Sequence, residues 1–85
     1  MRTAEELGAE VRARRRELGL TQQELAARAH VTRQWIARLE HGHERAELDP
    51  LLRTIFQLEM ELRVEPAVVE DDLDDYVRSF ARAEE

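Results

Sequence analysis

Side chains that hydrogen-bond or pack against nucleic-acid bases recur at helical spacing in the segment TRQWIARLEHG, residues 32–42. At 100° per residue, Gln34, Ala37 and Arg38 fall opposite the apolar side of the helix, and Arg33 lies at its N-terminal end. Arginine bonds O6 and N7 of guanine, glutamine bonds N6 and N7 of adenine, and an alanine methyl can contact thymine. The pattern predicts a base-contacting helix, with an ordinary solvated face as the alternative.

Start and stop signals place another short helix directly before this one. Thr21 and Glu24 have the spacing of a capping box, and the helix that they open ends at about His30. Thr32 caps the following helix, which stops at Gly42. Two short helices joined by a turn of this length are typical of a helix-turn-helix, whose second helix enters the major groove of DNA. This context favours base contact over a solvated face.

Two further helices are predicted around this pair. The first, over residues 4–18, opens with its own capping box and ends before Gly19. The fourth lies in LDPLLRTIFQL, residues 48–58, with Asp49 as N-cap and Pro50 at the first helical position. Its buried stripe is expected to contain Leu51 or Leu52, Ile55 and Phe56.

Residues 21–42 resemble the helix-turn-helix of the phage-repressor and Cro-like family, also called the Xre family. The shared frame is T-Q-x-E-L-A-x-x-A-x-V-T-x-x-x-I-x-x-L-E-x-G, and this sequence fits it without a gap. The resemblance implies a mainly α, repressor-like bundle of four to five helices that binds double-stranded operator DNA. The family usually has glycine where this chain has His30. Histidine is enriched among non-glycine residues with positive φ, so we expect the same turn.

The resemblance also implies individual roles. The residues expected at the bases are Arg33, Gln34, Ala37 and Arg38, and those expected at the DNA backbone are Thr21, Gln22, Thr32, Trp35 and Arg45. Glu40 would form a buried ion pair with an arginine of the first helix. Periodicity alone allows Arg14 or Arg15, and the resemblance selects Arg15. Trp35 falls between the inward and outward faces, so we expect its ring to be half-buried on the second helix.

A strand signal follows the fourth helix over residues 59–66. Met60, Leu62 and Val64 alternate with charged residues, and Pro66 ends the pattern. A single strand in a helical chain leaves its backbone groups unpaired, so we expect it to pair with its own copy, antiparallel about Leu62, in a homodimer. This pattern resembles HipB-type antitoxins, and the resemblance implies repression of their own operon and a HipA-like toxin kinase as partner.

Residues 67–85 form an acidic tail with apolar residues at helical spacing. The side chains on that stripe with a candidate contact role are Leu73, Tyr76, Val77 and Phe80. Three readings stay open: the tail packs on its own domain or its dimer partner, it binds a toxin, or it orders only on binding. We therefore divide the chain into a DNA-binding domain over 1–58, a dimerisation strand over 59–66 and this tail.

The charge of the chain is unevenly distributed. The formal net charge is −6, with +2 over residues 1–45 and −8 over residues 46–85, and all 13 cations are arginine. Arginine's planar fork suits guanine and phosphate, although a biased genomic composition is an equal alternative. An acidic tail would be repelled by DNA and is expected on the far side of the dimer.

Other function classes are disfavoured. The chain has no cysteine, no apolar run near the roughly 20 residues of a membrane span and no visible signal peptide, which predicts a soluble intracellular protein. The family resemblance implies a bacterial, cytoplasmic and nucleoid-associated one. His41 and His43 lack a preorganised third ligand, so no metal or cofactor is indicated, and no motif indicates an enzyme. The predicted function is an autoregulating antitoxin repressor. The alternatives are a stand-alone Xre-type regulator or a protein that mainly neutralises a toxin.

Overall fold

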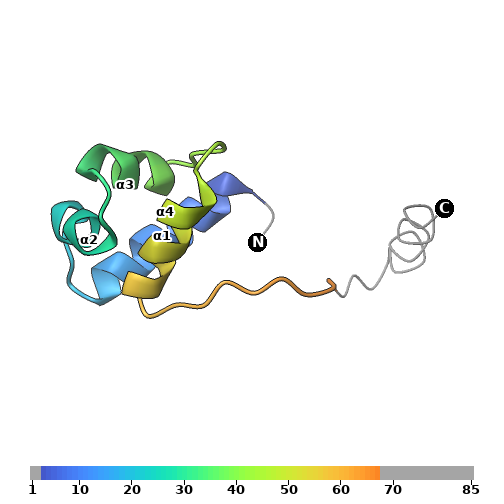
Figure 1. The fold of residues 1–85 in the computed structure, drawn as a ribbon. Helices are drawn as coiled ribbons and strands as arrows, with labels where there is room; N and C mark the ends of the chain where they lie inside the picture. Colours follow the sequence, from blue (N-terminus) through green and yellow to red (C-terminus); the bar gives the residue numbers. More distant parts are fainter. Residues whose placement is uncertain (1–2, 68–85) are drawn as a thin grey trace.

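Four α-helices make up the secondary structure of residues 3–67, the part of the chain that the computed structural model describes (Figure 1). They are α1 (Ala4–Glu17), α2 (Gln22–Ala29), α3 (Arg33–Glu40) and α4 (Leu48–Gln57). The mainly α fold is confirmed, with four of the four to five predicted helices in the described residues. The tail predicted over 67–85 lies almost entirely outside those residues. None of the four helices is long and apolar enough to cross a bilayer.

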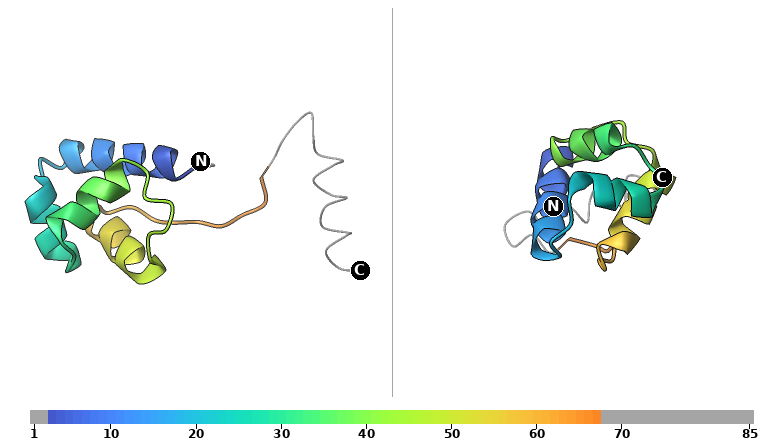
Figure 2. Two further views of the ribbon diagram at one scale, coloured as in Figure 1. Left: turned by 90° about the horizontal axis from the view of Figure 1, so that it is seen from above. Right: turned by 90° about the vertical axis from the view of Figure 1, so that its left-hand side faces the viewer.

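The second and third helices pack on each other and on the two flanking helices. α3 lies against α1 and α2, and α2 also lies against α4 (Figure 2). The core takes residues from all four helical regions, and its fully buried members are Val11, Leu25, Ala26, Ile36, Leu39 and Leu58. α3 is therefore held from two sides.

Threonine caps begin the first three helices, as the sequence predicts. The hydroxyls of Thr3, Thr21 and Thr32 each accept a hydrogen bond from the backbone N–H three residues on, at 3.0–3.1 Å. Glu24 completes the box on α2, because its carboxylate accepts from the Thr21 N–H at 3.1 Å. That bond lowers the pKa of Glu24, since it favours the charged carboxylate.

The start of α4 differs from the prediction. Glu47 is the N-cap residue rather than Asp49, and its side chain makes no capping hydrogen bond. Asp49 and Pro50 instead lie inside the first turn. Proline is tolerated there because the first N–H groups of a helix have no intrahelical acceptor, and the Asp49 carboxylate is favoured by the helix dipole.

The buried face of α4 was also predicted wrongly at one residue. Phe56 is 76% exposed, and Leu52, one of the two alternatives, is 40% exposed. The helix instead turns Leu51, Thr54, Ile55 and Leu58 toward the core. These positions are spaced i, i+3, i+4 and i+7, so they form one stripe that rotates Phe56 to the outside.

The strand predicted after α4 is not confirmed. Residues 60–67 run away from the helices without secondary structure (Figure 1), and no strand occurs between residues 3 and 67. A single chain offers this segment no neighbouring backbone, which a ladder requires. Val64 is 97% exposed and Leu62 is 42% exposed, while Met60 packs on the core. Pairing between two copies therefore stays a prediction.

A glycine inside α1 sets how closely α3 can approach. Gly8 is buried, and a Cβ built on it would clash with the Leu39 carbonyl oxygen and lie 2.8 Å from that of Glu40. A glycine in a helix interior costs about 1 kcal/mol relative to alanine, which is itself a signal of a packing constraint.

We predict that Gly8→Ala destabilises the protein by about 1–3 kcal/mol in urea unfolding, because the methyl group must push α3 away from α1. Helix propensity alone would give the opposite sign, a gain of about 1 kcal/mol. The control Glu10→Ala, at an exposed position of the same helix, should change stability by less than about 0.5 kcal/mol. A more stable Gly8→Ala variant would disprove the packing role.

Candidate nucleic-acid interface

The outward face of α3 presents hydrogen-bonding side chains to solvent. Arg33, Gln34 and Arg38 are exposed and Ala37 is half-buried among them, while Ile36 on the other side is fully buried. The structure thus brings the four predicted base-contacting residues onto one accessible helix face. Both arginines can donate two parallel hydrogen bonds to one base edge.

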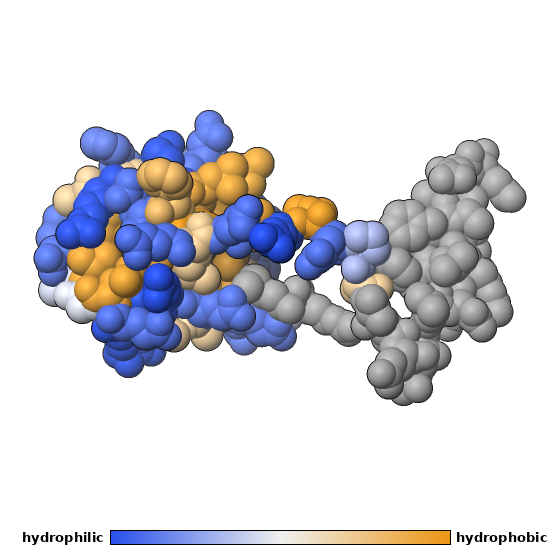
Figure 3. All heavy atoms as spheres, turned by 90° about the horizontal axis from the view of Figure 1, so that it is seen from below, coloured by the Kyte–Doolittle hydropathy of each residue, from blue (hydrophilic) through white to orange (hydrophobic). Residues whose placement is uncertain are grey.

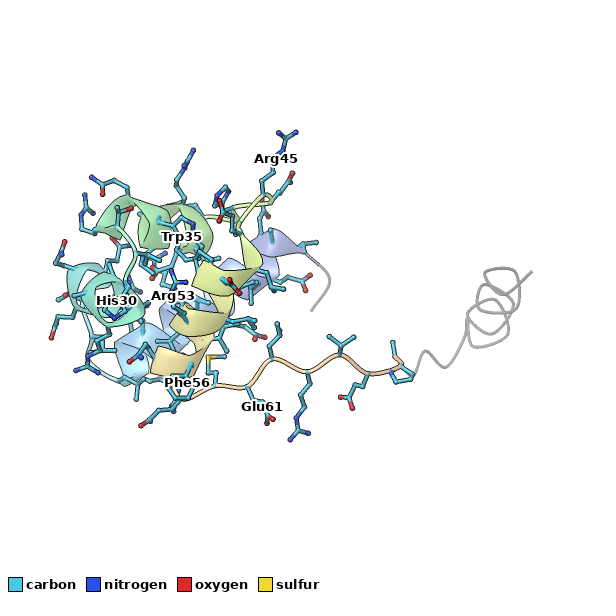
Figure 4. The ribbon with its side chains drawn as sticks, viewed as in Figure 1. His30, Trp35, Arg45, Arg53, Phe56 and Glu61 are labelled. Atoms are coloured by element: carbon cyan, nitrogen blue, oxygen red, sulfur yellow. The ribbon has the colours of Figure 1, made fainter. Side chains whose placement is uncertain are left out.

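The turn before α3 has the predicted left-handed residue. His30 adopts φ 57° and ψ 47° and ends α2 in place of the usual glycine. Figure 4 shows Arg53 of α4 close to this turn. Its Nε donates to the carbonyl of Ala29 at 2.9 Å, and its Nη2 lies 3.5 Å from the carbonyl of His30. Sequence reasoning missed Arg53, because only the packing of α4 on α2 brings it to this helix end.

A buried ion pair joins the end of α3 to α1. The Nε of Arg15 donates to Glu40 at 2.7 Å, and its Nη2 donates to the second carboxylate oxygen at 3.0 Å. The side chains are only 11% and 1% exposed. The third nitrogen of Arg15 bonds the Leu20 carbonyl at 2.8 Å, so the guanidinium also fixes the turn after α1. The hydrogen bond to Glu40 raises the pKa of Arg15, which stays charged throughout the neutral range.

The other candidate arginine has a different role. Arg14 donates from Nε to the Leu58 carbonyl at 3.0 Å and lies 3.6 Å from the Glu59 carboxylate. It therefore closes the C-terminal end of α4, where a cation is favoured by the helix dipole. Of the two arginines that periodicity allows, the structure pairs Arg15 with Glu40, as the resemblance implied.

Hydrogen bonds connect the buried pair to the exposed face of α3. The amide nitrogen of Gln22 lies 3.3 Å from Glu40, and its amide oxygen accepts from Arg33 Nη1 at 3.4 Å. Gln22, the first residue of α2, is thus placed between the core and a predicted base contact. The chain of bonds limits where the Arg33 guanidinium can lie.

Two threonines lie at helix N-termini on the expected DNA-backbone side. Thr21 and Thr32 are exposed, and each hydroxyl oxygen accepts from its own helix, so its proton remains free to donate to a phosphate. The N-termini of α2 and α3 carry partial positive charge, which favours a phosphate at either position.

The loop after α3 carries the last predicted contacts. Trp35 of α3 is half-buried, as expected, and its ring meets that of His43 in this loop edge-on at a centroid distance of 6.5 Å, while its expected place on the second helix stays a prediction. Arg45 projects from this loop on the same side of the domain as α3 (Figure 4). Together with Arg38 it lines an open groove of about 440 Å³ that also contains His41 and His43. A phosphate contact by Trp35 stays a prediction.

α2 and α3 are joined by a turn in which His30 is in the left-handed region, and α3 exposes arginine and glutamine. This arrangement defines a helix-turn-helix protein of the DNA-binding class. The family model described as a helix-turn-helix domain matches residues 6–54, more than half of the chain. The chain therefore belongs to the helix-turn-helix family, and its structural neighbours agree with the Xre/Cro-like type that the sequence resembles. No curated protein matches the chain in sequence.

Several solved structures with the same fold are those of proteins described as controller proteins or gene regulators. The restriction-modification controller protein C.AhdI from Aeromonas hydrophila is 26% identical, with TM-score 0.64, over 68% of this chain and 88% of that one. The clp gene regulator ClgR from Corynebacterium glutamicum is 27% identical, with TM-score 0.62, over 95% and 79%. The wild-type controller protein C.Esp1396I, 18% identical with TM-score 0.62 over 92% of each chain, shows the fold alone. The chain is a helix-turn-helix DNA-binding regulator.

We predict that Glu40→Ala lowers the free energy of unfolding by about 3–5 kcal/mol, because it leaves the buried Arg15 guanidinium without its carboxylate. Urea unfolding measures the loss. The control Glu17→Ala breaks the exposed pair with Arg14, which should be worth less than about 1 kcal/mol. Equal losses in the two variants would show that the pair does not secure α3.

Proposed function

We propose that the protein is a sequence-specific transcriptional repressor that binds operator DNA as a homodimer. One observation carries the proposal: α3 exposes Arg33, Gln34 and Arg38 on one face, while its opposite face is fixed by the core and by the Glu40 ion pair. Base discrimination needs side chains whose helix is held rigidly against the groove. The titles of C.AhdI and ClgR, a controller protein and a gene regulator, support a role in gene control.

In this proposal, each contact has a distinct task. Arg33, Gln34, Ala37 and Arg38 contact base edges in the major groove. Phosphates are held by the two capping threonines, Thr21 and Thr32, together with Gln22, Trp35 and Arg45 on either side of the base-contacting face. Phosphate contacts fix the register of the protein on the duplex, and base contacts select the sequence.

The homodimer is proposed from the segment after α4. Residues 60–67 have no secondary structure, and the apolar side chains of Leu62 and Val64 are 42% and 97% exposed. An antiparallel ribbon about Leu62 would bury these side chains against Met60 and Leu62 of a second copy and satisfy the backbone. Two copies related in this way would present two α3 helices to half-sites about one helical turn apart.

A more specific role as a HipB-type antitoxin rests on the sequence pattern of this segment. It would add a HipA-like toxin kinase as partner, with the acidic tail as its contact. The stand-alone Xre-type regulator is the other candidate, and it requires only the DNA contacts and the dimer. A kinase-like toxin gene beside this gene would favour the antitoxin.

We predict that Arg38→Ala weakens operator binding by about 1–3 kcal/mol and relaxes the preference at one base position. The measurement is a fluorescence-anisotropy titration against the operator selected from random DNA and its single-base variants. The control Arg16→Ala removes the same charge from an exposed position on α1. If Arg38→Ala weakens binding equally to every duplex, Arg38 contacts phosphate instead.

We predict that Leu62→Lys converts the free protein from dimer to monomer in sedimentation equilibrium. The two-fold pairing would place the two lysines opposite each other, and like charges in that position repel. The control Ala13→Lys adds the same charge at an exposed position on α1 and should leave the dimer intact. A dimeric Leu62→Lys variant would exclude the ribbon centred on this residue.

A further inference from the structure

An apolar stripe on α4 faces solvent in the described part of the chain. Leu48, Leu52 and Phe56, spaced four residues apart, are 62%, 40% and 76% exposed. We call these three residues the α4 stripe. Figure 3 shows hydrophobic side chains gathered among hydrophilic ones on the face of the domain seen from below. Three large apolar side chains in one row are typical of a contact surface for another helix.

Cations border one end of the α4 stripe. Leu52 and Phe56 line a groove of about 320 Å³ together with Arg28, His30 and Arg53. The acceptors of Arg53 at the end of α2 are neutral carbonyl groups. These bonds therefore do not neutralise its positive charge. A ligand for this groove therefore needs an apolar face with carboxylates beside it.

The C-terminal sequence of this chain has that composition. Residues 69–80 place Val69, Leu73, Tyr76 and Phe80 at helical spacing, and five carboxylates fall between residues 70 and 75. The segment therefore complements the groove in both hydropathy and charge. Once docked there, the same carboxylates would repel DNA from this face.

The proposed ribbon determines which protomer supplies the segment. In an antiparallel pair about Leu62, Val64 would lie opposite Met60 of the other copy, just after the turn that ends α4. Leu58 directly follows α4, and Phe56 lies at that end of the helix (Figure 4). The tail of one protomer would thus begin beside the α4 stripe of the other, whereas on its own protomer residues 60–67 lead away from α4 (Figure 1).

We propose that the acidic C-terminal segment of each protomer docks on the α4 stripe of the other protomer, with its carboxylates beside Arg28 and Arg53. This inference rests on the proposed homodimer. The exchange of segments would bury Phe56 and fasten the two DNA-binding domains in one relative orientation, which sets the spacing of the two α3 helices. In this proposal, the tail serves to hold the two protomers of the dimer together.

Paramagnetic labelling of the full chain tests this proposal. The chain has no cysteine, so a nitroxide on Ser79→Cys is unique. An unlabelled ¹⁵N chain is mixed with an excess of labelled ¹⁴N chain, so that most ¹⁵N chains pair with a labelled one, and the mass of the sample is measured. We expect the amide signals of residues 52–57 to lose at least half their intensity and to recover when the nitroxide is reduced. A Phe56→Glu substitution in the ¹⁵N chain should prevent the loss, and its exposed position makes the fold tolerant of it.

The outcomes separate the two hypotheses. A dimer without signal loss at residues 52–57 overturns the docking proposal and leaves the homodimer standing. In a second sample, the same chain carries both the nitroxide and ¹⁵N. If the signals are lost in that sample but not in the mixed one, the exchange between protomers is overturned. A monomeric mass overturns the homodimer itself. A label on Ala13→Cys, at an exposed position of α1, is the control for unspecific encounters between chains.

Discussion

The bidentate ion pair between Arg15 and Glu40 is the contact on which the position of α3 depends. α3 has only eight residues, and a helix of that length is not stable alone in water. Its apolar residues anchor it, but apolar packing is non-directional. Two buried charges are costly unless they meet in good geometry, so the pair is satisfied in one register of α3 on α1. Gly8 makes that register possible, because no side chain separates the helices there.

Arginine's planar fork recurs at the joints of the domain. Arg15 bonds a carboxylate and a carbonyl at once, Arg14 closes α4 and Arg53 holds the end of α2. Lysine could not make these several directed bonds from one rigid group. Some of the arginines of this chain therefore have a structural role, in addition to any contacts with DNA. Composition alone does not separate that role from a genomic bias toward arginine.

Features that depend on neighbouring residues could be predicted from the sequence, and features that depend on packing could not. The threonine caps follow from short-range spacing, and the exposed face of α3 follows from its period. The left-handed His30 follows from the resemblance to a family that usually has glycine at this position. Phe56 was misplaced because the orientation of α4 is set by what α1 and α2 leave open. The alternation after α4 indicates an apolar edge, and the second copy that we propose to cover it lies outside a single chain.

The central claim is that α3 selects a DNA sequence rather than only binding a charged backbone. The most direct measurement compares the Kd of the protein for a duplex selected from random DNA with its Kd for a scrambled duplex of the same composition, at physiological salt. If the exposed side chains of α3 select the bases, the selected duplex is preferred by roughly 10³-fold or more. Equal affinity for the two duplexes, falling together as salt rises, would contradict it.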